Sequence, residues 1–349
     1  MNDPAASTRR RSAASRQVAR ALWYVRPGVV ELKLATLPPL KSGEARVRTL
    51  YSGISRGTER LVMNGAVPPA EASRMRAPLQ EGGFPFPVKY GYCAAGIVED
   101  GPDTLTGKTV FCLHPHQDIF IAPAGMLVPL PDGLPARRAT LAANMETALN
   151  ALWDSGAGPG DRIVIVGAGI VGLLVAAIAA RLPGSDVTVV DVVDERRSLV
   201  EALGARFTGP ANSPTEADVV FHSSATGAGF NTAIAAAGME ATVVELSWYG
   251  AKAIEATLGA AFHSSRLRLI SSQVGQVSQS RRPRWSCRRR LEKALDLLQD
   301  DRFDALVSAE IAFAELPSLL PAVLNGSAVI LPPVIGYGVQ SSIMAAKDT

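Results

Sequence analysis

A run of glycines stands directly behind an apolar stretch near the middle of the chain. Residues 163–166 read IVIV, as expected for a strand buried on both faces, and residues 167–172 read GAGIVG. An apolar, alanine-rich segment follows, and a second β-branched run at 187–190 leads into Asp191. This order of strand, glycine turn, helix, strand and acid predicts a site that binds a dinucleotide.

The residues of the glycine turn have separate mechanical tasks. Gly167 permits the tight turn, Gly169 lets the backbone approach a pyrophosphate, and Gly172 allows the helix to pack closely on the strand. The helix that begins near Ile170 and Val171 offers free N–H groups and a partial positive charge to phosphates. We therefore expect these five residues to bind the cofactor.

The acid at the end of the second strand indicates which nucleotide binds. Asp191 is expected to accept hydrogen bonds from the ribose hydroxyls of NAD and to repel the 2′-phosphate of NADP. The sequence therefore predicts NAD. Arg196 and Arg197 follow closely, and these cations keep NADP open as the alternative.

Length and composition limit what surrounds this site. At 349 residues the chain exceeds one ordinary core, so two domains are expected. The net charge of +3 favours neither a nucleic-acid partner nor a membrane surface, and no uninterrupted apolar run predicts a membrane-spanning helix. Cys93, Cys112 and Cys287 form no CxxC pair, which favours a reducing compartment, and we expect a cytoplasmic protein.

The chain divides into a β-rich part and a part in which strands and helices alternate. Residues 1–20 lack the apolar core of a secretory signal and are expected to form a flexible tail. From Ala21 to Pro135, short apolar runs alternate with Pro and Gly turns, which predicts a β-rich domain. Beyond Asp191 we expect strands at 218–227, 242–246 and 267–275 and an amphipathic helix at 291–298.

Three segments ahead of the glycine turn resemble a known superfamily. They are YSGISRGTER (51–60), PVKYGYCAAGIVE (87–99) and NMETALN (144–150). Over residues 21–345 the chain resembles the medium-chain dehydrogenase/reductase superfamily of alcohol-dehydrogenase-like enzymes. Within it, SGISRGTERL is most similar to the subgroup that contains bacteriochlorophyllide a dehydrogenase.

The resemblance implies an α/β protein of two domains. A GroES-like, β-rich catalytic domain is expected over 21–147 and 280–349. A Rossmann domain with a doubly wound parallel sheet is expected over 148–279.

The zinc-ligand positions of this superfamily hold other residues here. Ser55 stands where the first cysteine is expected, and Ala143 stands at the third ligand. Tyr92 and Cys93 replace a histidine and a glutamate. Because a catalytic zinc needs three protein ligands and an open position, we expect a zinc-free enzyme with no metal site.

The resemblance also assigns cofactor contacts beyond the glycine turn. It implies them for Arg56, Arg196, Ala225, Thr226, Gln273 and Val274. By this resemblance, Arg56 is expected to face the pyrophosphate and Arg196 the adenosine side. Ala225 and Thr226 are expected beside the nicotinamide ribose. Gln273 and Val274 are expected to face the nicotinamide carboxamide.

Hydride transfer without zinc requires side chains that donate to the developing oxyanion. Tyr92 is the first candidate for this donor or general acid, with a structural tyrosine as the alternative, and Ser55 could share the work. Thr147 matches a residue that contacts the nicotinamide, and its hydroxyl could also reach the substrate. Glu146 and Glu59 are candidate proton relays, with pairing to Arg56 or Arg60 as the alternative.

Three further features allow more than one interpretation. His114 and His116 would share one face of a strand, and without further ligands nearby we predict surface or cleft-lining histidines rather than a metal site. Cys93 is predicted to pack in the core rather than to react. Residues 281–290 carry six arginines, which form either a solvated loop and helix start or a surface that attracts an acidic substrate.

The first hypothesis is a zinc-independent, NAD(H)-dependent oxidoreductase acting on an alcohol/ketone pair. The subgroup likeness would make its substrate a hydroxyethyl side chain on a large ring or a related biosynthetic alcohol. The alternatives are a quinone or enone reductase and a catalytically silent protein that senses NAD(H). The expected partners are a small-molecule substrate and further copies of the chain, because superfamily members are commonly dimers or tetramers.

Overall fold

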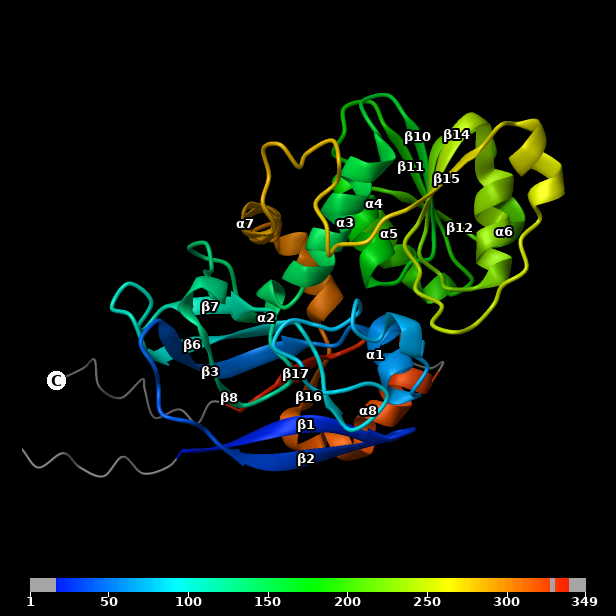
Figure 1. Cartoon of the computed structure of the whole chain (residues 1–349). Coiled ribbons are helices and arrows are strands. Elements are labelled where there is room, and N and C mark those ends of the chain that lie inside the picture. The colour runs from blue at the N-terminus through cyan, green and yellow to red at the C-terminus, as the bar shows by residue number, and fades with distance from the viewer. Residues whose placement is uncertain (1–16, 327–329, 339–349) are drawn as a thin grey trace, which may run out of the picture.

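The computed structural model describes residues 17–326 and 330–338. Its strands form three sheets, of which one belongs to a nucleotide domain and two to a β-rich domain (Figure 1). This architecture confirms the predicted α/β class with its two kinds of domain. No helix in the described ranges is long and apolar enough to cross a membrane.

The nucleotide domain is built on a six-stranded sheet in which every neighbouring pair is parallel. Its strands, in spatial order, are β12 (Arg206–Thr208), β11 (Asp186–Val190), β10 (Arg162–Val166), β13 (Ala217–His222), β14 (Ala237–Glu245) and β15 (Arg268–Ser271). The order reverses between β10 and β13. In open sheets of this type, a dinucleotide binds across that reversal, at the carboxyl ends of the strands.

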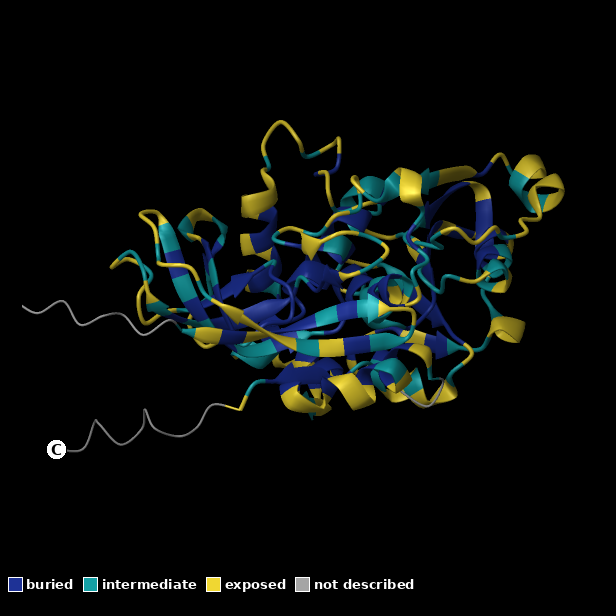
Figure 2. Cartoon of the chain, turned by 60° about the horizontal axis from the view of Figure 1, so that its bottom comes forward, coloured by how far each residue is buried: buried dark blue, intermediate teal, exposed yellow. Residues whose placement is uncertain are grey.

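The continuous apolar run of β10 is explained by helices on both faces of the sheet. Ile163 and Ile165 pack into one core cluster with α4 (Ile170–Ala179), whereas Val164 and Val166 pack into another with α6 (Gly227–Ala236). Side chains alternate across a strand, so each face needs its own apolar set. Figure 2 shows the resulting buried interior.

The β-rich domain contains two mostly antiparallel sheets. The smaller has the order β2 (Val29–Thr36), β1 (Val18–Arg26), β5 (Val88–Lys89) and β4 (Glu81–Gly82). The larger has the order β16 (Glu310–Ala312), β17 (Val334–Gly336), β3 (Glu44–Gly53), β6 (Ala94–Asp100), β7 (Thr109–Cys112) and β9 (Val128–Pro129), and β8 (Ile119–Pro123) pairs with β3. Its helices are α1 (Arg56–Met63), α2 (Ala136–Ala139) and α8 (Leu316–Asn325).

Helix α3 (Ala142–Ser155) joins the two domains and packs against α4 and α7 (Cys287–Leu297). One core cluster runs from Phe111 of the β-rich domain to Leu173 of α4. The predicted boundary at 147 and 148 therefore falls inside a continuous helix.

Several expectations about elements differ from the structure. The strand expected over 218–227 ends at His222, and the strand expected over 242–246 begins at Ala237. Strand β1 begins at Val18, so the predicted tail over 1–20 is wrong at its end, while residues 1–16 lie outside the described residues. Helix α7 begins at Cys287, ahead of the predicted 291, because the Ser286 hydroxyl accepts from the N–H of Arg289 at 3.1 Å and caps the helix. The strand expected over 267–275 ends at Ser271.

Candidate functional site

A cavity of about 480 Å³ lies where the two domains meet. The β-rich domain and α3 line it with Ile54, Ser55, Arg56, Gly57, Thr58, Arg60 and Asn144. The nucleotide domain contributes the glycine turn, Asp191, Arg196, the segment 223–226 and the segment 246–248. The second set stands at the carboxyl ends of the strands, around the reversal of strand order, where a dinucleotide is expected.

The backbone of the glycine turn fits its three tasks. Gly167 has a φ of +112°, and a Cβ there would meet the Ser224 nitrogen at 2.8 Å. A Cβ on Gly172 would stand 1.9 Å from the Gly167 carbonyl oxygen, so α4 packs too closely for any side chain. A Cβ on Gly169 would meet nothing within 4 Å, because that residue opens toward the cavity. The first turn of α4, with Ile170 and Val171, lines the same wall.

Asp191 holds the turn in place as well as facing the cavity. Its Oδ2 accepts from the N–H of Ala168 at 2.6 Å and from Arg196 Nη1 at 3.0 Å, and its Oδ1 accepts from the N–H of Val193 at 2.8 Å. Arg196 in turn donates from Nε and Nη2 to the carbonyl oxygen of Ile330. The acid predicted to select the nucleotide is therefore paired with a cation.

Arg56, predicted to face the pyrophosphate, does line the cavity. Its Nη2 donates to the carbonyl oxygen of Gly326, at the end of α8. Burial lowers the pKa of its guanidinium, with Arg60 and Arg196 acting in the same direction. A cluster of cations thus faces the place where phosphates are expected.

Ser55 and Tyr92 lie together. The Tyr92 hydroxyl donates to Ser55 Oγ at 2.5 Å and to Thr58 Oγ1 at 3.3 Å. Ser55 and Thr58 line the cavity, whereas Tyr92 lies behind them. Burial raises the pKa of the Tyr92 phenol, so it stays protonated and can act as a donor through ordinary pH.

The side chains at the former ligand positions do not fit zinc. Two are neutral hydroxyls bonded to each other, and the third position is the methyl group of Ala143. The nearby Glu59 carboxylate already accepts from Tyr24, from His116 and from the N–H of Ser55. Within 17–326 and 330–338, no group of three His, Cys, Asp or Glu residues could hold a metal ion. Cys93 is buried in the core, where burial raises the pKa of its thiol.

The prediction of surface or cleft-lining histidines is wrong for His114 and His116, which are both buried. The His114 ring stacks on Phe120 with the centroids 3.8 Å apart, and burial lowers its pKa to about 3. His116 lies between Glu59, at 3.1 Å from Oε2, and the hydroxyl of Ser52, at 2.8 Å. These rings are part of the interior of the β-rich domain.

Glu146 lies in a buried ion pair away from the cavity, which argues against the predicted relay. Its Oε1 accepts from Arg290 Nε at 3.0 Å. Burial raises the pKa of Glu146, while Arg290 opposes that shift. Arg290 also donates to the Asn150 side chain and to the carbonyl oxygens of Val274 and Gln276. One member of the arginine-rich segment is thus a structural residue that fastens α7 to α3, and the others are at least partly exposed.

The remaining predicted residues divide into two groups. Ala225 and Thr226 line the cavity, and the Thr226 hydroxyl accepts from the N–H of Gly229 to cap α6. Thr147, Gln273 and Val274 are not among the cavity-lining residues. Thr147 donates its hydroxyl to the Ala143 carbonyl within α3, and the Gln273 side chain accepts from the N–H of Gly275.

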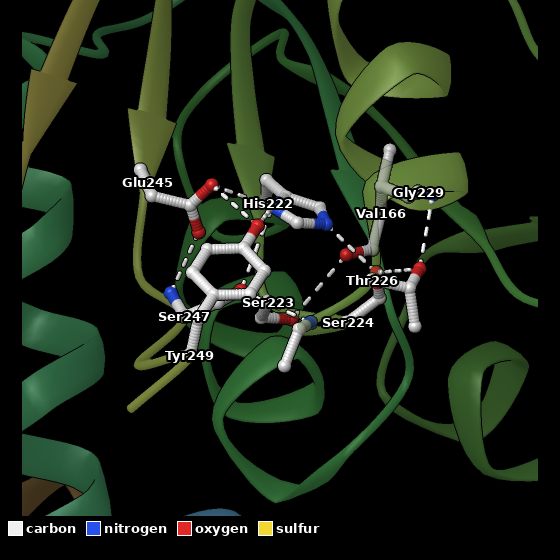
Figure 3. A network of polar contacts seen from close by, with 10 residues as sticks. Val166, His222, Ser223, Ser224, Thr226, Gly229, Glu245, Ser247 and Tyr249 are labelled. Carbon is white, nitrogen blue, oxygen red and sulfur yellow. Dashed lines mark hydrogen bonds and ion pairs between the residues drawn. The ribbon is translucent and has the colours of Figure 1, made fainter. Parts of the chain in front are cut away.

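Sequence reasoning missed a polar network at the ends of β13 and β14 (Figure 3). His222 is fully buried between the Glu245 carboxylate and the hydroxyl of Ser224, which lines the cavity. The sequence signal was a histidine two residues ahead of a serine at the end of a predicted strand. Its carboxylate partner could not be found without the register of β14, which sets Glu245 opposite His222.

No family model matches the sequence. The chain is 38% identical over 88 residues to an uncharacterized zinc-type alcohol dehydrogenase-like protein of Haemophilus influenzae, a match covering 25% of each chain. It is 27% identical over 151 residues to D-xylulose reductase A of Aspergillus niger, covering 41% of this chain and 42% of that protein. The chain therefore matches less than half the length of these two relatives.

Solved structures match over nearly their whole length. A Sinorhizobium meliloti protein described as a zinc-binding dehydrogenase and bound to NADP has a TM-score of 0.74 at 17% identity, covering 92% of this chain and 100% of that chain. L-idonate 5-dehydrogenase of Escherichia coli has a TM-score of 0.74 at 16% identity, covering 92% and 99%. This chain has the fold of the medium-chain alcohol dehydrogenases. The partial sequence matches agree with this fold.

Proposed function

We propose that the protein is an oxidoreductase that transfers a hydride between a nicotinamide dinucleotide and an alcohol or ketone. The observation that carries the proposal is the composition of the cavity between the domains. One wall has the glycine turn, the N-terminus of α4 and Asp191, and the other has the hydroxyls of Ser55 and Thr58. A nucleotide and a small substrate can therefore meet between two walls of suited chemistry.

Residues of both domains would hold the cofactor. The first turn of α4 and Arg56 would bind the pyrophosphate, and Asp191 would bind a ribose hydroxyl. The bound nicotinamide supplies the hydride acceptor or donor. NAD is the proposed form because Asp191 carries a negative charge, and NADP is the competing form because Arg196 pairs with that charge.

Ser55 and Tyr92 would supply the proton chemistry on the opposite wall. Ser55 accepts from Tyr92, so its own hydroxyl hydrogen remains available to a substrate oxygen in the cavity. Tyr92 orients Ser55 and polarises it as charge develops on that oxygen. Both side chains act as neutral donors.

We also propose that the reaction does not use zinc. The support is the donor set: Ser55, Tyr92 and Ala143 offer no thiolate, imidazole or carboxylate. The relatives named above include zinc-type proteins, so this property would separate the chain from them.

The finer proposals concern the substrate, the assembly and the compartment. The likeness to the bacteriochlorophyllide a dehydrogenase subgroup suggests a hydroxyethyl group on a large ring, and the exposed arginines between 281 and 289 would favour an acidic ring substituent. We further propose a homo-oligomer, as is common in the superfamily. Cys93, Cys112 and Cys287 are all free thiols, which suits a reducing compartment such as the cytoplasm.

A paired titration with NADH and NADPH, followed by nicotinamide fluorescence, tests the proposal. We expect tighter binding of NADH, weakened in Asp191→Ala and kept in Asp194→Ala, which removes an exposed carboxylate on the adjacent turn. The bound form is then used to screen alcohols, ketones and enones by the absorbance of the reduced nicotinamide. Absence of binding by either nucleotide would refute the proposed function, and reduction of enones alone would replace the alcohol/ketone assignment.

A further inference from the structure

At the carboxyl ends of β13 and β14, a buried histidine connects a carboxylate to the cavity. His222 Nδ1 lies 2.8 Å from Glu245 Oε2, and His222 Nε2 lies 2.7 Å from Ser224 Oγ. The His222 side chain has no exposed surface, whereas Ser224 is half-buried and lines the cavity. Figure 3 shows His222 between Glu245 and Ser224.

The surroundings leave Glu245 as the charged partner of this histidine. On strand β10, Val166 stands beside His222. Arg162, the charged residue of β10, stands at the other end of that strand. Helix α6 brings the Phe230 ring at 5.8 Å and has no charged residue. Beyond β14, the Tyr249 hydroxyl donates to Glu245 Oε2 at 3.1 Å. Burial raises the pKa of Tyr249, so this phenol stays neutral.

The hydrogen bonds of Glu245 keep it ionised. Burial alone would raise the pKa of its carboxyl, but His222 and the N–H of Ser247 outweigh burial and lower that pKa. A carboxylate at Nδ1 favours the tautomer with its hydrogen on Nδ1, which leaves Nε2 as an acceptor for the Ser224 hydroxyl. The pair thus carries a net charge of about −1 when His222 is neutral and about zero when it is protonated.

Ser224, at the cavity end of this series of hydrogen bonds, can accept one more hydrogen bond. Ser224 Oγ contacts His222 Nε2 and, at 3.0 Å, Thr226 Oγ1. A hydroxyl offers one donor and two acceptor sites, so one acceptor remains for a group in the cavity. The backbone keeps the contact open, because a Cβ on Gly229 would stand 2.1 Å from Ser224 Oγ.

We propose that Glu245, His222 and Ser224 form a proton-holding relay, and that Ser224 accepts a hydrogen bond from a ribose hydroxyl of the bound dinucleotide. This inference rests on the proposed function. Asp191 stands at the end of β11, on one side of the reversal of strand order, so the second nucleoside lies over the ends of β13 to β15. Ser224 is on that side.

The relay gives the cleft a place for the proton that alcohol oxidation releases together with the hydride. Ser224 passes its own hydrogen to His222 Nε2 and takes one from the ribose hydroxyl. The ribose hydroxyl in turn takes the proton of the substrate hydroxyl, whose carbon gives its hydride to the nicotinamide, so protons and electrons balance. Oxidised nicotinamide carries one positive charge more than the reduced form. Electrostatics therefore favours neutral His222 with the oxidised form and protonated His222 with the reduced form.

Calorimetric titration with NAD⁺ and NADH over a range of pH, in two buffers of different ionisation enthalpy, tests the relay. In the wild type we expect the ratio of the Kd for NAD⁺ to the Kd for NADH to fall with rising pH, by up to about tenfold per unit where one proton is linked. His222→Gln should make the ratio independent of pH. His263→Gln, which removes an exposed histidine, should behave as the wild type.

Two further variants separate the parts of the relay and protect the test against a folding defect. Ser224→Ala should weaken the binding of NAD⁺ and of NADH about equally, by roughly 2- to 10-fold, which is the range expected for the loss of one hydrogen bond. Glu245→Gln should flatten the pH dependence of the Kd ratio, as His222→Gln should. If His222→Gln does not fold, Glu245→Gln replaces it in the test.

Each outcome bears on a different proposal. An unchanged pH dependence in folded His222→Gln or Glu245→Gln would overturn the relay while leaving the oxidoreductase intact. Proton linkage that appears only with an alcohol present would overturn the assignment to a ribose hydroxyl. If no nicotinamide nucleotide binds, both the relay and the proposed function are refuted.

Discussion

Arg196 Nη1 lies 3.0 Å from Asp191 Oδ2, and both side chains are largely buried at the edge of the cavity. The acid that would repel a 2′-phosphate is therefore partly neutralised before any nucleotide arrives. Because Arg196 also donates to the Ile330 carbonyl, it is held in place rather than free to follow a ligand. In the proposed function, the pair of Asp191 and Arg196 would therefore discriminate between NAD and NADP, rather than Asp191 alone.

Removing the arginine should sharpen the preference for NADH. In Arg196→Ala the Asp191 carboxylate loses its cation, so we expect the affinity for NADPH to fall at least about tenfold relative to NADH. Competitive fluorescence titration measures this ratio. Arg197→Ala is the matched control, since Arg197 pairs with the exposed Asp194. An unchanged ratio in Arg196→Ala would show that Asp191 does not contact the ribose.

Loss of the buried phenol should affect turnover more than cofactor binding. Tyr92→Phe removes the donor to Ser55 and Thr58, and we expect kcat to fall by about 10- to 100-fold with the Kd for NADH nearly unchanged. Ser55→Ala, which removes the hydroxyl in the cavity wall, should lower kcat by at least as much as Tyr92→Phe. Steady-state rates combined with fluorescence titration measure both quantities.

The control for that pair is Tyr51→Phe, a tyrosine of β3 that does not line the cavity. It should retain the wild-type rate. A Tyr92→Phe enzyme as fast as the wild type would reduce Tyr92 to a structural residue.

The nucleotide wall of the site was predictable from the sequence because its signals are local. Strand, glycine turn and helix are contiguous, and Asp191 ends the next strand along the chain. The pairing of Glu146 with Arg290 was not predictable, because it depends on how α7 packs against α3 over a separation of 144 residues. His222 and Glu245 meet only through the parallel register of β13 with β14.

The burial of His114 and His116 was missed for a related reason. The prediction placed both histidines in a strand, whereas the structure places them between β7 and β8, where alternation along a strand does not apply. The β8 residue Phe120 covers His114, and the α1 residue Glu59 meets His116. Glu59 and His116 are 57 residues apart in the sequence, and the shorter separation of His114 and Phe120 does not itself reveal that their rings stack, so only the folded arrangement shows these contacts.

The ion pair between α3 and α7 should matter for stability. Arg290→Ala leaves Glu146 buried without its cation, and we expect a loss of about 3–5 kcal/mol in the free energy of unfolding. Urea unfolding measures this loss. Arg284→Ala, in the exposed part of the same segment, should change stability by less than about 0.5 kcal/mol. Replacing both partners, Glu146→Leu with Arg290→Met, should recover much of the loss; equal losses in the single and double variants would contradict the ion-pair explanation.

Acid should destabilise the fold in part through His114. Burial lowers its folded pKa to about 3, whereas the unfolded chain protonates this histidine below about pH 6.5. In that window the unfolded state binds more protons, so stability falls as pH falls, by about 2 kcal/mol from this group at about pH 5. Urea unfolding at about pH 7.5 and about pH 5 should show a correspondingly smaller pH dependence in His114→Asn. The exposed-site variant His263→Asn should keep the wild-type dependence, and a His114→Asn variant that also keeps it would refute the assignment.

The three former ligand positions predict both the metal content of the protein and how to change it. Neutral hydroxyls at Ser55 and Tyr92 and a methyl group at Ala143 leave a divalent ion without a charged donor, so purified protein should hold far less than one zinc per chain. Elemental analysis after dialysis against a weak chelator measures this. Ser55→Cys, Tyr92→His and Ala143→Cys in one chain restore three good ligands and should raise the content toward one. Stoichiometric zinc in the wild type would contradict the zinc-free mechanism, because the ion would then have to be bound by side chains that the donor set does not include.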